Sequence, residues 1–319
     1  MRLLVIGTCA LAALALAGPS PSTPSGALLT YGISYRSLGR PTGPLTGRIC
    51  LAYPDGSHAV RVLSKGDYRE PAWSPGGRYL AYSRQTTARE RKRIRNRPAY
   101  EIFIATARGR VIRDVSMGMS VFNGGPAWSP DGRRLAFASA LRQSIISVVP
   151  RKGGQPIQIA GGGGPTWTPD GTRIVFSGSD GAGRDEIASI RPNGTDRRLI
   201  IPGATGPAFS PDGTKLAYIR RAGSPIGAET DVFVANADGT EERRLTNTPE
   251  GEGGPTWSPD GSLIAFTRLK LDLDDHRWVS VVRSDSGEEV AVIRGPHSAF
   301  DPSWRRPVNL PTAKRPSCF

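Results

Sequence analysis

The stretch that decides the fold reads PAWSPDGRRLAFAS, at Pro126–Ser139. The chain repeats it in PAWSPGGRYLAYSR at Pro71–Arg84, PTWTPDGTRIVFSG at Pro165–Gly178, PAFSPDGTKLAYIR at Pro207–Arg220 and PTWSPDGSLIAFTR at Pro255–Arg268, and a decayed copy, PSWRRP, begins at Pro302. Successive copies begin 39 to 55 residues apart. Strand-rich repeats of this length are typical of propeller blades, so the sequence predicts an all-β fold of stacked units.

Each repeat predicts two β-hairpins. Pro130-Asp131-Gly132 is a turn between two extended runs, and a second hairpin follows, as in Asp231–Ala235 with its turn at Asp238-Gly239. The unit is therefore a four-stranded antiparallel blade. One position recurs as a large aromatic residue, which we expect to pack between blades: Trp73, Trp128, Trp167, Phe209, Trp257 and Trp304. The repeated turn carboxylates should bond their own backbone: Asp131, Asp170, Asp212 and Asp260.

The pattern S-P-D-G-x-x-[LI]-A-[FY] resembles the WD40-like PD40 repeat of TolB-type six-bladed propellers, from about Gly26 to the C-terminus. The resemblance implies six four-stranded blades, without the N-terminal α/β domain of TolB. The last copy departs from the pattern, because Arg305-Arg306 follow its tryptophan. We expect the segment of Trp304 to supply the first strand of the last blade and N-terminal strands to supply the others: Ala27–Tyr31, Ile49–Tyr53 and Val60–Leu63.

The N-terminus predicts export. Met1-Arg2 precedes the apolar run Leu3–Ala17, which is typical of a signal peptide cleaved after Ala17. A membrane anchor and a lipoprotein site at Cys9 are the alternatives. The predicted organisation is a signal peptide at 1–17, a Pro/Ser-rich linker at 18–26 and a six-bladed β-propeller at 27–319.

Two cysteines would remain after cleavage, Cys50 and Cys318. Closure of the ring would bring Cys50 and the C-terminal tail near the same blade. An exported protein with two cysteines commonly forms a disulfide, so we predict a Cys50–Cys318 bridge, with two free thiols as the alternative.

A net charge of +14 favours acidic partners. Loops that vary between the repeats should lie on one face of the ring, which we take as the binding face. One of them, Gln85–Pro98, carries a basic segment that we predict to be the binding site: Arg89, Arg91, Lys92, Arg93, Arg95 and Arg97. A solvated surface loop is the alternative, and the lack of interleaved aromatic residues argues against nucleic acid.

Two other segments carry weaker signals. Leu271–Asp275 holds three aspartates but lacks the glycine and distal glutamate of a calcium loop, so we expect a plain acidic loop. Gly161–Gly164 lacks the Lys-Ser/Thr of a phosphate loop, so we expect a tight connection between blades.

The sequence gives little support to an enzyme. It has no G-x-S-x-G motif, and its histidines, at 58, 276 and 297, lack metal-ligand spacing. We therefore predict an exported, monomeric, non-catalytic binding module for an envelope protein or an anionic cell-wall polymer, with no cofactor, no metal and no membrane span in the mature chain. The alternative is an envelope polysaccharide lyase or hydrolase, which needs a metal or a pair of carboxylates at the central channel.

Overall fold

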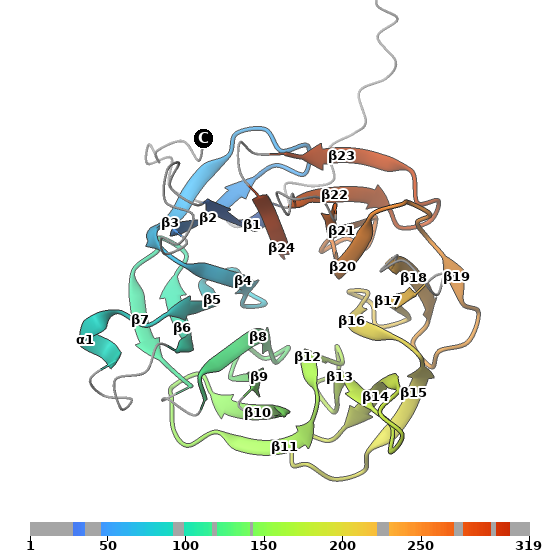
Figure 1. Cartoon of the computed structure of the whole chain (residues 1–319), viewed down its shortest axis with the longest axis horizontal. Helices are drawn as coiled ribbons and strands as arrows, with labels where there is room; N and C mark the ends of the chain where they lie inside the picture. The colour runs from blue at the N-terminus through green and yellow to red at the C-terminus, as the bar shows by residue number, and fades with distance from the viewer. Residues whose placement is uncertain are drawn as a thin grey trace, which may run out of the picture.

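Antiparallel groups of four strands surround a common axis (Figure 1). This computed structural model describes residues 28–35, 46–91, 99–116, 120–140, 143–221, 230–270, 277–294 and 298–306. The predicted all-β architecture of four-stranded antiparallel units is confirmed. The predicted signal peptide and linker lie outside the described residues and stay predictions.

Three sheets contain four strands each in chain order. They are β12 (Gly163–Trp167), β13 (Ile174–Ser179), β14 (Asp185–Ile190) and β15 (Arg198–Pro202); β16 (Thr205–Phe209), β17 (Lys215–Arg221), β18 (Thr230–Asn236) and β19 (Arg243–Arg244); and β20 (Gly251–Trp257), β21 (Leu263–Leu269), β22 (Arg277–Arg283) and β23 (Glu289–Ile293).

An eight-stranded sheet joins two further groups through one parallel residue pair, Tyr100 with Phe122. The first group is β4 (Tyr68–Trp73), β5 (Tyr79–Gln85), β6 (Tyr100–Thr106) and β7 (Val111–Asp114), with the short helix α1 (Ala88–Arg91) after β5. The second group is β8 (Phe122–Trp128), β9 (Arg134–Ala140), β10 (Ser144–Pro150) and β11 (Ile157–Gly161).

The last sheet combines both ends of the described chain. Its order is β24 (Ser298–Arg305), β1 (Leu28–Tyr35), β2 (Thr46–Ala52) and β3 (Val60–Gly66). β24 pairs antiparallel with β1, so that Leu29 lies opposite Trp304. In Figure 1, β24 lies nearest the axis, like β4, β8, β12, β16 and β20 in their own groups.

The Pro-Asp-Gly turns form as the sequence predicts. Asp131 Oδ1 accepts hydrogen bonds from the Arg133 N–H at 3.0 Å and from Ser129 Oγ at 2.6 Å. Gly132 has a φ of +66°, which favours glycine. Asp170, Asp212 and Asp260 accept equivalent bonds from the backbone two residues on, at 3.0, 3.1 and 3.1 Å. The structural role predicted for these carboxylates is confirmed.

The recurring tryptophans pack between neighbouring groups, as predicted. Each indole N–H donates to the strand nearest the axis in the preceding group, or to β1: Trp128 to Ala72 O (3.0 Å), Trp167 to Ala127 O (3.2 Å), Trp257 to Ala208 O (3.0 Å), Trp304 to Thr256 O (3.1 Å) and Trp73 to Thr30 Oγ1 (2.6 Å). The buried apolar clusters also draw on two adjacent groups each. Cohesion therefore depends on contacts between groups as well as within them.

Arg305 joins the last sheet to the first turn. It stands where the other units have the turn serine or threonine, and it is 1% exposed. Its guanidinium donates to Gly77 O, at 3.4 Å from Nε and 3.2 Å from Nη2, and lies 4.5 Å from the centre of the Trp73 ring. The turn that it contacts has Gly76 in place of the usual aspartate.

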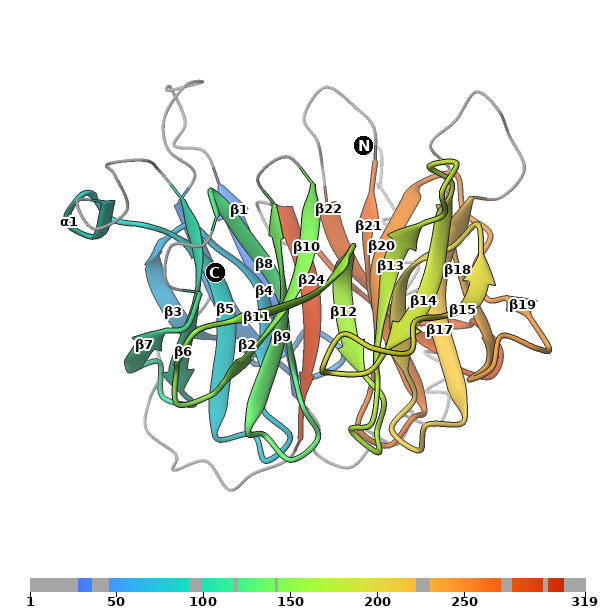
Figure 2. The same ribbon diagram turned by 90° about the horizontal axis from the view of Figure 1, so that it is seen from below.

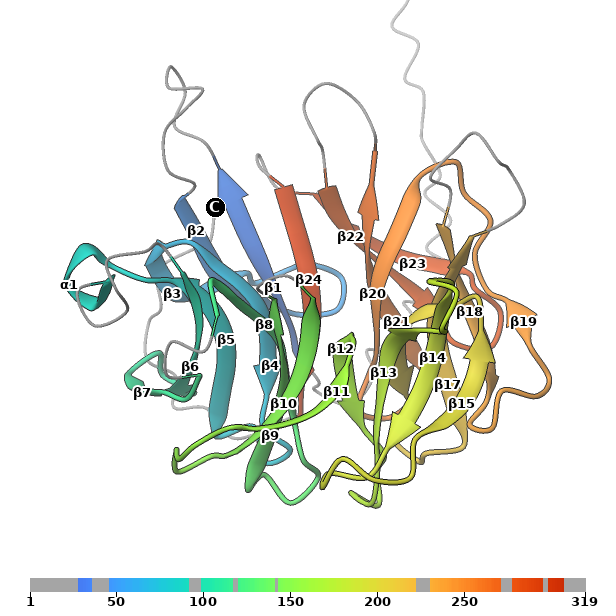
Figure 3. The same ribbon diagram turned by 60° about the horizontal axis from the view of Figure 1, so that its bottom comes forward.

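The two faces of the molecule, seen along the common axis of the strand groups, differ (Figures 2 and 3). The hairpin turns that join β4 to β5 and β8 to β9 lie on one face, which we call the Pro-Asp-Gly face. α1 lies toward the opposite face, which we call the variable-loop face.

Candidate functional site

The basic segment, which lies in the predicted variable loop Gln85–Pro98, begins in the helical turn α1. Thr87 and Glu90 form a capping box at α1: Glu90 Oε2 accepts from the Thr87 N–H at 2.8 Å, and Thr87 Oγ1 accepts from the Glu90 N–H at 3.3 Å. Arg84 Nη2, on β5, lies 2.7 Å from Glu90 Oε1. These contacts fix a turn that would be too short to persist alone.

The structure describes only the start of the predicted binding site. Arg89 is exposed on α1, and Arg91 is its last residue. The other four predicted residues lie outside the described residues: Lys92, Arg93, Arg95 and Arg97. The same holds for Leu271–Asp275 and for Cys318, whereas Cys50 is buried on β2. The basic segment and the disulfide therefore stay predictions.

A second feature, which the sequence analysis missed, lies on the strands nearest the axis. The residue before the proline of each repeat has a positive φ, between +50° and +62°: Glu70, Gly125, Gly164, Gly206, Gly254 and Asp301. Glycine adopts this backbone freely, whereas other residues are strained there by about 1 kcal/mol. Two adjacent groups thus place carboxylates where the others have glycine.

The two carboxylates connect three consecutive inner strands. Asp301 Oδ2 accepts from the Glu70 N–H at 3.2 Å, and Glu70 Oε2 accepts from the Gly125 N–H at 2.8 Å. Burial raises the pKa of Glu70 to about 7, and the negative charge of Asp301 adds to the rise. Burial also raises the pKa of Asp301. Such a pair can hold a proton near neutral pH, as a general acid requires.

A sequence signal for this pair existed. In the aligned repeats, the residue before the proline is glycine four times, and Glu70 and Asp301 are the two departures from it. Comparing the copies at that one position would have singled them out. Glu70 and Asp301 adjoin because β4 and β24 are neighbouring strands near the common axis (Figure 1).

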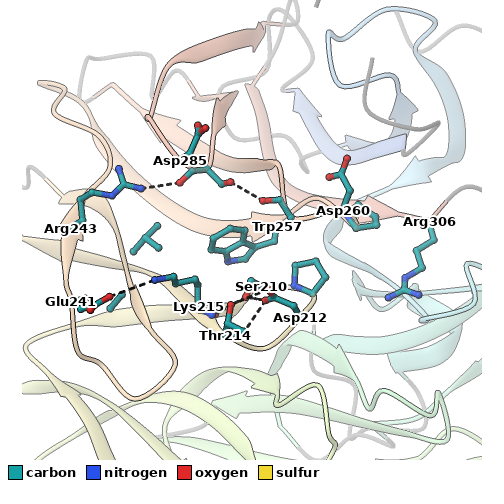
Figure 4. Close-up of a pocket in the computed structure, with 16 residues that line it drawn as sticks. Ser210, Asp212, Thr214, Lys215, Glu241, Arg243, Trp257, Asp260, Asp285 and Arg306 are labelled. Atoms are coloured by element: carbon teal, nitrogen blue, oxygen red, sulfur yellow. Dashed lines mark hydrogen bonds and ion pairs between the residues drawn. The ribbon is translucent and has the colours of Figure 1, made fainter. Parts of the chain in front are cut away.

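Two cavities on the Pro-Asp-Gly face share part of their walls. One, of about 300 Å³, lies at the axis and is lined by the tryptophans of the inner strands. The other, of about 720 Å³, lies between the groups β16–β19 and β20–β23 (Figure 4). Both are lined by Pro211, Trp257, Pro259 and Arg306.

The larger of these cavities has mixed charge. Lys215 Nζ lies 3.9 Å from Glu241, and Arg243 Nη2 donates to Ser284 O at 2.9 Å (Figure 4). Asp212 is held in its turn by Ser210 and Thr214. The wall carries charged side chains of both signs, so the cavity shows no strong preference for an anion or a cation.

The variable-loop face contains an open cavity of about 910 Å³, with Gly161, Gly162 and Gly163 in its wall. The glycine run, expected to be a plain connection, therefore also shapes this cavity. A Cβ atom added to Gly163 would meet nothing within 4 Å. The buried carboxylate of Glu186 forms an ion pair with Arg197 in the same wall.

No cluster of three or more His, Cys, Asp or Glu side chains suited to a metal occurs in the described part of the chain. Across the same ranges, no helix is long and apolar enough to cross a membrane.

The PD40 family model, described as TolB beta propeller domain, matches residues 46–306. The chain belongs to this family. A search of curated protein sequences finds no match. The resemblance of the repeats to PD40 propellers is thus confirmed.

Solved structures share the fold of this PD40 chain. TolB from Acinetobacter baumannii has 22% identity and a TM-score of 0.67, over 89% of this chain and 68% of that chain. A putative TolB from Agrobacterium tumefaciens has 19% identity and a TM-score of 0.61, over 89% and 100%. A chain in a nidogen/laminin complex has 12% identity and a TM-score of 0.67, over 88% and 99%.

Proposed function

We propose that the protein is an exported, monomeric, closed six-bladed propeller that binds a partner without catalysing a reaction. In this proposal the sheet of β24, β1, β2 and β3 is the blade that closes the ring. The partner is an envelope protein or an anionic envelope polymer, bound on the variable-loop face through the basic segment Arg89–Arg97. Membership of the TolB propeller family supports a binding module, and the apolar run Leu3–Ala17 supports export.

The observation that carries the proposal is the anchoring of α1. The capping box and the Arg84–Glu90 ion pair hold the start of the basic segment on the end of β5. A binding loop that starts from a fixed base loses less conformational entropy when it binds. A Cys50–Cys318 disulfide, which we also propose, would stabilise the closing blade in an oxidising compartment.

The test compares three proteins in pull-downs from envelope extracts at low and high salt. The first is the mature chain, and the second has serine at the six basic positions of Arg89–Arg97. The third is a control with six serines at exposed arginines of the groups β12–β23: Arg184, Arg191, Arg198, Arg221, Arg243 and Arg283. We expect only the loop variant to lose the bound partner, and binding by the mature chain to weaken at high salt. Retention of the partner by the loop variant would refute the role of the segment.

A second candidate function is an envelope polysaccharide hydrolase or lyase. The observation that favours it is the Glu70–Asp301 pair, whose raised pKa values suit acid–base chemistry. The test is a screen of envelope glycans for cleavage by the mature chain and by Glu70→Gln. Cleavage that Glu70→Gln abolishes would establish the enzyme, and no cleavage of any glycan would leave the binding module as the function.

A further inference from the structure

A basic cluster that the sequence analysis did not identify occupies the Pro-Asp-Gly side of the groups β4–β7 and β8–β11. We call it the basic wedge. It consists of eight residues in or next to the hairpin turns of those groups: Arg78, Arg108, Arg110, Arg113, Arg133, Arg134, Arg151 and Lys152. All except Arg134 and Arg151 are exposed.

Contacts between the turns make the wedge continuous. Within each group, the Ala107 N–H donates to Arg78 O at 2.9 Å, and the Arg151 N–H donates to Arg133 O at 2.8 Å. Two contacts join the groups: the Arg113 guanidinium donates to Lys152 O, and the Arg151 guanidinium lies 4.7 Å from the centre of the Tyr79 ring.

The cations of the wedge lack carboxylate partners. Among the described residues, no carboxylate oxygen lies within 4.0 Å of any of the eight, whereas several exposed arginines of the groups β12–β23 are paired. Arg184 and Arg198 each lie 2.8 Å from an aspartate, and Arg283 lies 3.1 Å from Glu288.

The difference arises from substitutions in the turns. The first turn of β4–β7 has Gly76 where four other units have aspartate, and its second turn has Arg108 where the unit β16–β19 has Asp238. The wedge retains Asp131, which is bound to Ser129 and to its own turn. Like charges concentrated in this way destabilise the folded protein unless anions neutralise them.

The side chains of the basic wedge indicate which type of polyanion it binds. Seven of its eight cations are arginines, whose planar guanidinium binds two phosphate oxygens at once. A folded protein partner would need an apolar centre in the interface. The exposed aliphatic residues nearby, Val111, Ile112 and Ile157, lie instead on the outermost strands β7 and β11.

Among phosphodiester polymers, nucleic acid suits the basic wedge less well than a polymer without bases. Binding of single strands depends on free aromatic faces for the bases. Arg151 lies over the Tyr79 ring, which stacks on Trp128 at 6.4 Å, and Trp128 is only 8% exposed.

We propose that the basic wedge binds a linear polyol-phosphate polymer of the cell envelope, through its phosphodiester groups. This proposal rests on the export of the protein, which is part of the proposed function. The basic wedge, however, lies on the opposite face from the basic segment Arg89–Arg97.

The experiment measures binding of fluorescently labelled poly(glycerol phosphate) to the mature chain at low and moderate salt. The wedge variant carries Arg78→Gln, Arg108→Gln and Arg133→Gln, all at exposed turn positions. The control variant carries Arg184→Gln, Arg191→Gln and Arg198→Gln, and therefore has the same net charge. Circular dichroism and thermal midpoints establish that both variants are folded.

We expect the Kd of the wedge variant to rise by at least about tenfold, because three charge-assisted contacts are lost, and that of the control to change by less than about threefold. Absence of binding by the mature chain, or equal weakening in both variants, would overturn the proposal. Tighter binding of single-stranded DNA or polyglutamate of equal charge would overturn the choice of ligand. A serine variant of Arg89–Arg97 should retain the polymer, and loss of binding there would move the site to the variable-loop face. If the serine variant of Arg89–Arg97 retains the polymer but loses the envelope partner, both the basic wedge and the basic segment are upheld as binding sites.

Discussion

Replacing Arg305 by methionine should destabilise the protein, because this buried guanidinium joins β24 to the first Pro-x-Gly turn. The substitution removes the donors to Gly77 O, at 3.2 and 3.4 Å, and the cation 4.5 Å from the Trp73 ring. Hydrogen bonds from a charged group contribute about 1.5–3 kcal/mol, and a desolvated cation–π contact contributes up to about 2 kcal/mol.

The desolvation of a charge that is 1% exposed offsets part of this gain, and methionine restores some packing. The net loss in free energy of unfolding should therefore be about 1–3 kcal/mol. Urea titration monitored by tryptophan fluorescence measures it, provided that the slope of the transition is unchanged.

The adjacent Arg306 provides the matched control, because it is exposed and its replacement by methionine changes the charge equally. Arg306→Met should change stability by less than about 0.5 kcal/mol. Equal urea midpoints for Arg305→Met and the wild-type protein would refute the assignment of a joining role to Arg305.

Three further predictions concern stability. The free energy of unfolding should fall by about 1–3 kcal/mol between pH 5 and 8, because the folded protein binds a proton at Glu70 up to its raised pKa of about 7 and the unfolded chain does not. Glu70→Gln should remove most of that slope in urea titrations, and an unchanged slope would contradict the assignment. Trp167→Phe removes an inter-blade hydrogen bond and should cost about 1–2 kcal/mol in thermal unfolding, whereas an unaltered midpoint would argue against that role. Reduction should cost about 4 kcal/mol if Cys50 and Cys318 form a disulfide, and the unreduced protein should resist alkylation; rapid labelling of both thiols would exclude the bridge.

The repeated sequence was sufficient to predict the strands, the turns and the packing of the tryptophans. Each of these features depends on residues within one repeat or on one position of the adjacent repeat. Asp131 illustrates the first case, because its bonds go to Ser129 and Arg133. Trp128 illustrates the second, because it reaches Ala72 at the corresponding position of the previous group.

The features that the sequence did not predict depend on contacts between particular atoms of different repeats. Nothing local to Arg305 or Glu70 shows that one reaches Gly77 and the other Gly125. The basic wedge likewise combines turns that are separate in the sequence, such as those of Arg78 and Arg151. The capping box is the exception, because Thr87-x-x-Glu90 is a local pattern that could have been recognised.

The pairing of β24 with β1 also bears on the order of events during folding. Leu29 and Trp304 come from opposite ends of the described chain, yet they are partners in one sheet. That sheet cannot form until β24 has been synthesised, and contacts so distant in sequence form slowly. The folding intermediate that precedes this pairing would leave the edge of β1 open to other chains. A binder for that edge should therefore delay folding but should not affect the folded protein.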